Sequence, residues 1–382
     1  MPFISKPEDD PIALARHIIE FGDEQDEEME LQPEAAALAD LGLSWPSGLA
    51  PDPQPLNEDP ASSDPLPRAD VLVVTWTAAE NEALADALTP GVNRKKWYFY
   101  DRKFNQYLPK IRNGAPARKA QRLGSYFPTK IGNKSVLCFK SELHLNQDGM
   151  ATGEGTATLP VADLFRQMIK EVRPKLVITV GTAGATFNDH ELGDVMITRA
   201  AKFRLSQEFR NEPFNGRTYK CESFDIPTAR LDEARELLKK HADKLLEPDF
   251  GPPTKRFNFS GPLIKAPKNT PDLKIDSVHF DEFHPMLTTD FFEFGTSKNN
   301  LEEEGCGVEM GDAVLGMVIE EMDGDAPEWL VIRNASDPQI NGDLPDKPRA
   351  RNMQAHWAVW YYETYGYWTS VNSAIATWAM IA

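Results

Sequence analysis

The stretch PKLVITVGTAGA, residues 174–185, decides the fold class. Its first half is a short apolar run rich in β-branched residues, which is typical of a strand buried on both faces. Its second half is rich in glycine, so we expect the strand to break into a turn there. Similar apolar runs at 69–76, 134–141 and 192–200 are further strand candidates, and a helix pattern covers 161–172. Strands that alternate with helices predict an α/β fold with a largely parallel sheet.

Two later segments repeat this pattern of an apolar strand followed by polar residues, namely CGVEM at 306–310 and EWLVIRNAS at 328–336. The region at about 206–285 is different, because a predicted helix at 228–246 precedes a Pro- and Lys-rich section with weak periodicity. We interpret this region as an insertion that covers the surface near the strand ends, where open α/β sheets bind ligands.

Acidic and basic residues are unevenly distributed along the chain. The 382 residues carry a formal net charge of −18, which argues against general nucleic-acid binding. Residues 1–68 hold 16 acidic and three basic side chains, and 50–67 is rich in Pro, Asp and Ser. We therefore predict an acidic N-terminal arm that ends in a linker, with the main domain over 69–382. The basic block at 94–122, with ten basic and one acidic side chain, leaves room for a phosphate-bearing ligand.

Cysteine and histidine residues show no metal-binding pattern. Cys138, Cys221 and Cys306 are widely spaced without a CxxC pair, and the histidines nearest the motifs lack ligand spacing. We predict no metal and no cofactor. The first residues lack a secretory signal pattern, and no apolar run approaches the ~20 residues of a membrane span, so we expect a cytoplasmic protein without membrane contact.

Four polar segments follow the C-terminal ends of predicted strands. They are TWTAAENE with Glu80, VGTAGA with Gly181 and Thr182, VEMGDA with Glu309 and Asp312, and RNASD with Ser336 and Asp337. Because such ends meet in one crevice of an open α/β sheet, we expect a ligand site there. Each segment also has an ordinary explanation, since Glu80, Thr182 and Asp312 suit helix caps or first turns and Asp-Pro suits a turn.

These segments also carry a family resemblance. In the order VLVVTWTAAENEAL, KLVITVGTAGA, LGDVMITRA, VEMGDAVLG and WLVIRNASD, the chain resembles the purine nucleoside phosphorylase and methylthioadenosine/S-adenosylhomocysteine nucleosidase superfamily over about 69–205 and 286–382. The resemblance implies a twisted mixed β-sheet flanked by helices and cleavage of an N-glycosidic bond. It also implies a small-molecule purine nucleoside or nucleotide as ligand and a homo-oligomer, a dimer or a hexamer.

The resemblance assigns catalytic roles to two carboxyl groups. Asp337 matches the general acid that protonates the purine as it leaves, with Ser336 to orient it. Glu80 matches the nucleosidase base for water, and Thr182 with Gly181 matches the glycine turn beside the substrate. Phosphorylases carry an arginine where this chain has Thr179. The missing guanidinium favours hydrolysis over phosphorolysis.

The sugar and base contacts depart in part from the family pattern. Nucleosidases read close to VEME, in which the second Glu holds the ribose hydroxyls and Met packs on the sugar, here Met310. This chain has Gly311 instead, so Glu309 and Asp312 would take over the hydroxyl contacts, or ribose binding is altered. Phe291 or Phe292 would stack on the purine, although either suits a core position as well.

The identity of the 5′ group stays open at this level. The basic block and Lys255, Arg256, Lys265 and Lys268 of the insertion would suit a phosphorylated 5′ end, as in AMP or ATP. Nucleotide-depleting nucleosidases of bacterial antiviral defence are one precedent in the superfamily. The alternative is that the basic block neutralises the acidic arm. Two other functions remain, a phosphate-dependent phosphorylase and a nucleotide-binding sensor whose site has degenerated at Gly311.

Overall fold

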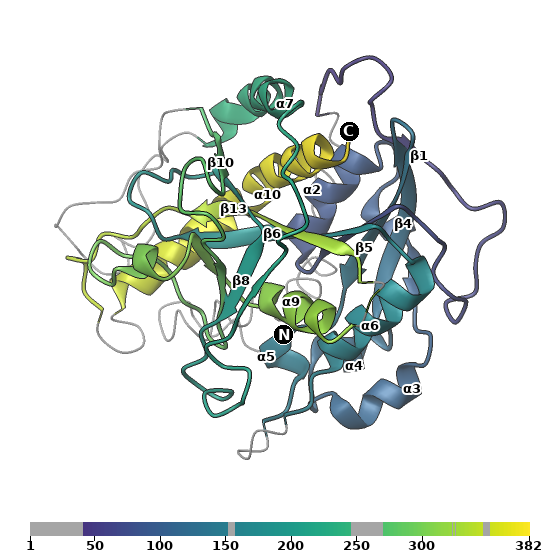
Figure 1. Ribbon diagram of the computed structural model, residues 1–382, viewed down its shortest axis with the longest axis horizontal. Coiled ribbons are helices and arrows are strands. Elements are labelled where there is room, and N and C mark those ends of the chain that lie inside the picture. Colours follow the sequence, from purple (N-terminus) through teal and green to yellow (C-terminus); the bar gives the residue numbers. More distant parts are fainter. Residues whose placement is uncertain (1–40, 152–156, 246–269, 323, 325, 347–351) are drawn as a thin grey trace, which may run out of the picture.

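The computed structural model describes residues 41–151, 157–245, 270–322, 324, 326–346 and 352–382. Within these residues a thirteen-stranded sheet forms the centre of the molecule (Figure 1). In chain order its strands are β1 (Asp52–Pro53), β2 (Val71–Thr75), β3 (Tyr98–Tyr100), β4 (Gly124–Ile131), β5 (Lys134–Ser141), β6 (Leu176–Ala185), β7 (Val195–Thr198), β8 (Ala200–Phe203), β9 (Thr218–Lys220), β10 (Leu273–Ile275), β11 (Met286–Thr288), β12 (Gly307–Glu309) and β13 (Glu328–Asp337).

The sheet contains both parallel and antiparallel pairs. The central strands β5, β2, β6 and β13 are neighbours in this order, and all three pairs are parallel. Antiparallel pairs join β4 to β5, β12 to β6 and β13 to β7. The expected mixed sheet flanked by helices is therefore confirmed, and parallel pairing is confined to its centre and to the β8–β11–β12 and β7–β10 neighbours.

Strand β6 corrects one expectation, because it does not break at its glycines. It continues to Ala185, paired along its length with β13 and at its end with β12. Gly181 and Gly184 do not have positive φ angles, so these glycines are not needed to form a turn. A Cβ atom at Gly181 would lie 2.5 Å from Glu80 Oε1, which shows that this glycine permits a close approach of side chains instead.

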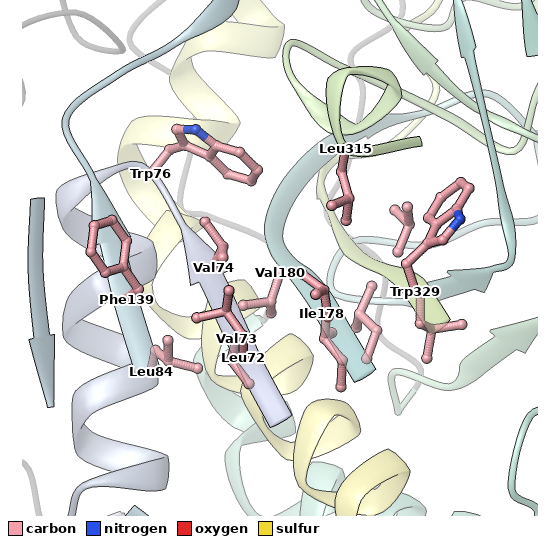
Figure 2. Packing of buried hydrophobic residues seen from close by; sticks show 14 of the residues in the cluster. Leu72, Val73, Val74, Trp76, Leu84, Phe139, Ile178, Val180, Leu315 and Trp329 are labelled. Atoms are coloured by element: carbon pink, nitrogen blue, oxygen red, sulfur yellow. The ribbon is translucent and has the colours of Figure 1, made fainter. Parts of the chain in front are cut away.

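Apolar side chains of the parallel strands form the main core. All five residues of β2 are buried, and Leu72, Val73 and Val74 lie beside Ile178 and Val180 of β6 in Figure 2. Burial of such side chains on both sheet faces explains why these segments read as continuous apolar runs. The core thus fixes the strands whose C-terminal ends carry the polar motifs.

Helices cover both faces of the central strands (Figure 1). Helices α2 (Ala78–Leu88), α7 (Leu231–Leu238) and α10 (Met353–Ile381) pack together on one side, and α6 (Pro160–Val172) packs with α9 (Asp312–Glu320) on the other. The shorter helices are α3 (Phe104–Tyr107), α4 (Pro116–Ala120), α5 (Leu145–Asp148) and the 3₁₀ turns η1 (Arg94–Lys96), η2 (Leu108–Lys110), η3 (Lys239–Leu245) and η4 (Leu301–Glu303). The aromatic stretch at 356–370 belongs to α10, in which Trp357 and Tyr361 are buried in the core.

The segment that precedes the first core strand packs on the fold. Leu41 and Leu66 are buried, and β1 pairs antiparallel with β4. The Trp378 Nε1 atom donates to the Leu49 carbonyl at 2.7 Å. Within the predicted linker at 50–67, β1 and Leu66 thus contact the domain. The rest of the predicted acidic arm, 1–40, lies outside the described residues.

The predicted insertion contributes elements at the rim of the sheet. Strand β9 pairs with β8, β10 pairs with β7, and the predicted helix at 228–246 is α7 followed by η3. Residues 246–269, with the four basic residues named above, lie outside the described part. Among the described helices none is both long and apolar enough to span a membrane. The described residues also contain no cluster of three or more His, Cys, Asp or Glu that could hold a metal ion.

Candidate functional site

A pocket lies at the C-terminal ends of β2, β6 and β13, and it brings most of the polar motifs together. Its walls surround about 680 Å³ of space, the open mouth included. Its walls come from segments far apart in the sequence: Trp76, Thr77, Glu80, His144, Thr182, Ala183, Gly184, Thr289, Phe292, Glu293, Val308, Glu309, Met310, Gly311, Arg333, Ser336, Asp337 and Tyr362.

Asp337 ends β13 as a buried acid in the pocket wall. Its side chain is 3% exposed, and Ser336 Oγ donates to its Oδ1 atom at 3.1 Å. Its Oδ2 atom is buried without a hydrogen-bond partner among the described residues. Burial raises the pKa of Asp337 to about 8, and the bond from Ser336 only partly opposes this shift. The carboxyl group is therefore protonated at neutral pH and can donate a proton into the pocket.

Glu80 lies in the first turn of α2, and its pKa is shifted in the opposite direction to that of Asp337. Its Oε2 atom accepts from the Thr77 amide at 2.9 Å and forms a capping box with that residue. Its Oε1 atom accepts from the amide and the hydroxyl of Thr182, both at 2.8 Å. Burial alone would raise the pKa of Glu80, but the nearby Arg333 and these hydrogen bonds hold it below its usual value. Glu80 is thus both a helix cap and an ionised group in the pocket.

Arg333 is the central residue that the sequence analysis did not single out. It projects from β13, is 3% exposed, and its guanidinium lies over the Trp76 ring at 4.9 Å. Its Nη1 atom lies 3.9 Å from Glu80 Oε1, and its Nη2 atom lies 3.3 Å from Glu309 Oε2. An arginine inside the apolar run WLVIRN was the available signal, because a charge in a buried strand needs partners.

Asp312 corrects the expectation of a direct sugar contact. Its side chain is fully buried, it does not line the pocket, and it binds Arg333 through both oxygens. The distances are 2.9 Å from Nε to Oδ2 and 2.5 Å from Nη2 to Oδ1. The Asp312 side chain is directed toward Arg333 because the buried guanidinium binds both of its oxygens away from solvent. The backbone at Gly311 does not present the Asp312 side chain to the pocket.

Glu309 occupies the pocket wall and also begins the next helix. Its Oε1 atom accepts from the Asp312 amide at 2.8 Å, and Thr288 Oγ1 donates to the same oxygen. Glu309 therefore caps α9, whose cap residue Gly311 has no side chain to do so. Burial and the Asp312 carboxylate raise the pKa of Glu309, against the opposing effect of Arg333.

The other predicted contacts divide between the pocket and its surroundings. Thr182, Phe292 and Met310 line the pocket, whereas Phe291 does not. Gly181 lies behind the wall, between Glu80 and Arg333. A Cβ atom at Gly311 would lie 3.4 Å from the Trp76 ring, so this position has room for only a small group. Sequence reasoning did not single out the lining residues Trp76, Thr77, His144, Thr289, Glu293 and Tyr362.

The basic block at 94–122 does not contribute to the pocket wall, because none of its ten basic side chains lines the pocket. Several of them pair with acidic residues of the same fold: Arg102 with Glu171, Lys110 with Asp163, Arg112 with Glu208, and Arg122 with Glu142. The structure therefore does not connect this block with a phosphate group in the pocket.

Comparison with known proteins gives structural likeness only. No family model and no curated protein matches the chain. A 5′-methylthioadenosine/S-adenosylhomocysteine nucleosidase of Helicobacter pylori is similar with a TM-score of 0.42 and 11% identity, over 82% of this chain and 98% of that one. The futalosine hydrolase of the same organism has a TM-score of 0.41 and 11% identity, over 81% and 96%.

A third solved structure shows the same degree of likeness. The 5′-methylthioadenosine/S-adenosylhomocysteine nucleosidase of Neisseria meningitidis has a TM-score of 0.40 and 13% identity, over 82% of this chain and 98% of that one. At these identities and TM-scores, any assignment of activity to this chain rests on its own residues.

Proposed function

We propose that the protein hydrolyses the N-glycosidic bond of a purine nucleoside or nucleotide and releases the free base. The main support for this proposal is that two carboxyl groups in one pocket have pKa values shifted in opposite directions. Burial raises the pKa of Asp337 to about 8, whereas Arg333 and hydrogen bonds lower that of Glu80. A pair of carboxyl groups whose environments push their pKa values apart is the usual arrangement for one acid and one base.

The chemistry of glycoside cleavage needs both groups. The sugar carbon develops positive charge in an oxocarbenium-like transition state, and the departing purine needs a proton. In the proposed mechanism protonated Asp337, with its unpartnered Oδ2 atom, supplies that proton to the purine. Ionised Glu80 then accepts a hydrogen bond from the attacking water and takes its proton as the bond between the water oxygen and the sugar carbon forms. The low pKa makes Glu80 a weak base, but its negative charge stabilises the positive sugar.

Hydrolysis fits the pocket better than phosphorolysis. Of the described pocket residues, Arg333 alone carries a guanidinium, and Asp312, Glu309 and Glu80 already surround it. Thr179, at the position of a phosphorylase arginine, is buried in β6 and does not line the pocket. Phosphate binding relies on cationic donors that are free to bind it. The arrangement therefore supports water as the nucleophile.

The remaining roles are part of the proposal. Phe292 would stack on the purine, Met310 would pack on the sugar, and Thr182 and Glu309 would contact the hydroxyl groups, all from the pocket wall. AMP and ATP stay candidate substrates beside unphosphorylated nucleosides. Assembly into a homo-oligomer stays a prediction.

The direct test is the release of free base. The full-length protein is incubated with adenosine, methylthioadenosine, AMP and ATP, and free adenine is separated by chromatography. Adenine formed without added phosphate supports the proposal. No free base under any condition would instead favour a binding protein with the same pocket.

A further inference from the structure

His144 has a property that the proposed reaction does not use. It follows β5, lines the pocket and is only 9% exposed. Both of its ring nitrogens are buried without a hydrogen-bond partner among the described residues. A buried polar group without a partner costs stability, so such groups in native proteins generally serve a ligand or water.

An acidic residue lies directly behind the imidazole. Asp148 is fully buried and accepts from the His144 amide at 2.6 Å through Oδ2, which also lies 3.8 Å from His144 Nδ1. The Oδ1 atom of Asp148 has no partner within the described part. The hydrogen bond from the backbone amide positions His144 at the pocket, and both ring nitrogens stay available to a ligand.

The strand order places His144 far from the catalytic acid. Asp337 ends β13, and the neighbours β6, β2 and β5 follow in that order, with His144 just beyond β5. Three inter-strand spacings amount to about 14 Å. If the purine lies beside Asp337, the sugar falls near Glu80 of the β2–α2 junction. The sugar's 5′ carbon, on the side away from the base, then points toward His144.

Two further polar side chains line the pocket. They are Thr77, the N-cap residue of α2, and Tyr362 of α10. An apolar 5′ substituent would leave the imidazole unpaired. We propose, given the purine nucleosidase function proposed above, that His144, positioned by Asp148, binds an oxygen atom on the 5′ carbon of the substrate.

A 5′ hydroxyl and a 5′ phosphate ester both present such an oxygen. Glu80, whose pKa is held below its usual value, is an anion in the pocket wall, and the guanidinium of Arg333 is already held by carboxylates. These described charges suit the uncharged hydroxyl better than the phosphate. His144 would make the enzyme select 5′-hydroxyl nucleosides over 5′-deoxy and 5′-thioether analogues.

The test compares adenosine, AMP and 5′-deoxyadenosine as substrates of the full-length protein. We expect kcat/KM for adenosine to exceed that for 5′-deoxyadenosine at least about tenfold, and His144→Phe to bring this ratio close to one. A higher kcat/KM for AMP than for adenosine would identify the oxygen as a phosphate oxygen. His279→Phe, an exposed histidine outside the pocket, is the matched control and should keep the wild-type ratio.

Binding of the same three ligands to an Asp337→Asn background, measured by calorimetry, separates this inference from the proposed function. If no base is released from any substrate, the proposed function fails, yet a binding preference for the 5′ oxygen that His144→Phe abolishes still supports the subsite. The subsite is refuted if the wild type has equal kcat/KM for adenosine and 5′-deoxyadenosine. It is also refuted if His144→Phe lowers kcat/KM for both by the same factor. If His144→Phe does not fold by thermal unfolding, His144→Leu serves the same comparison.

Discussion

Asp312 and Arg333 form a bidentate ion pair behind the pocket wall, with both side chains buried. The pair holds a guanidinium between Glu80 of α2, Glu309 of β12 and the carbonyl of Thr182, which accepts from Arg333 Nη1 at 3.4 Å. Three strands and two helices therefore meet at one buried cation. Its charge lowers the pKa of Glu80, so the pair belongs to the architecture of the site.

Asp312→Ala should destabilise the protein strongly, because it leaves the Arg333 charge buried with weaker partners. We expect the free energy of unfolding, measured in urea, to fall by about 3–5 kcal/mol. Asp343→Ala is the matched control, since its pair with Lys298 is exposed on both sides and should contribute about 0–1 kcal/mol. If both variants lose the same free energy of unfolding, the buried pair stabilises the protein no more than the exposed pair does.

Asp337→Asn should abolish most of the activity while the pocket keeps its shape. Loss of the proton donor should lower kcat at least about 100-fold. Because burial raises the pKa of Asp337 to about 8, its protonated form is lost above that pH, so wild-type activity should fall as the pH rises through 8. Ser336→Ala, which removes the bond to Oδ1, should cost less. An Asn variant with normal turnover, or activity that rises above pH 8, would contradict this role.

Glu80→Gln should impair both folding and turnover. A neutral amide accepts more weakly from Thr77 and Thr182, and its NH₂ group would face one of these donors. We expect a loss of about 1–3 kcal/mol in unfolding free energy and a lower kcat. Glu82→Gln, two residues along the same helix and outside the pocket, is the control and should change neither quantity by much. The role would be refuted if the two variants behaved alike.

The two glycines of the site should respond differently to alanine. At Gly181 a methyl group would lie 2.5 Å from Glu80 Oε1 and 2.6 Å from Arg333 Nη1, so Gly181→Ala should cost about 1–3 kcal/mol and shift both groups. At Gly311 it would meet the Trp76 ring at 3.4 Å, an ordinary contact, and the φ of −164° is extended. Gly311→Ala should therefore leave stability nearly unchanged and act mainly on KM. Thermal unfolding and steady-state kinetics of both variants check this contrast.

The sequence predicted the strands of the core well, because two-sided burial produces continuous apolar runs such as 71–75 and 176–180. It also located Asp337, Glu80 and Glu309 at strand ends that meet. It could not show that β6 continues through its glycines, since pairing with β12 comes from a distant segment. The direction of the Asp312 side chain depended on the same kind of tertiary contact, as its partner Arg333 lies on another strand.

The basic block illustrates the limit of charge counting. Ten basic residues in one stretch suggested a phosphate near the site, but none of them lines the pocket; Arg102 pairs with Glu171 of α6, and Arg122 pairs with Glu142, which follows β5. Conversely, His144 gave no signal because a single histidine has no motif. Its significance comes only from its position in the pocket and its unpartnered nitrogens.

The measurement that tests the central claim most directly is release of adenine from a nucleoside or nucleotide with and without inorganic phosphate, by the wild-type protein and by Asp337→Asn. Our account predicts release by the wild type in phosphate-free buffer, no gain when phosphate is added, and little or no release by Asp337→Asn. Strict dependence on phosphate, or equal release by the two proteins, would contradict it.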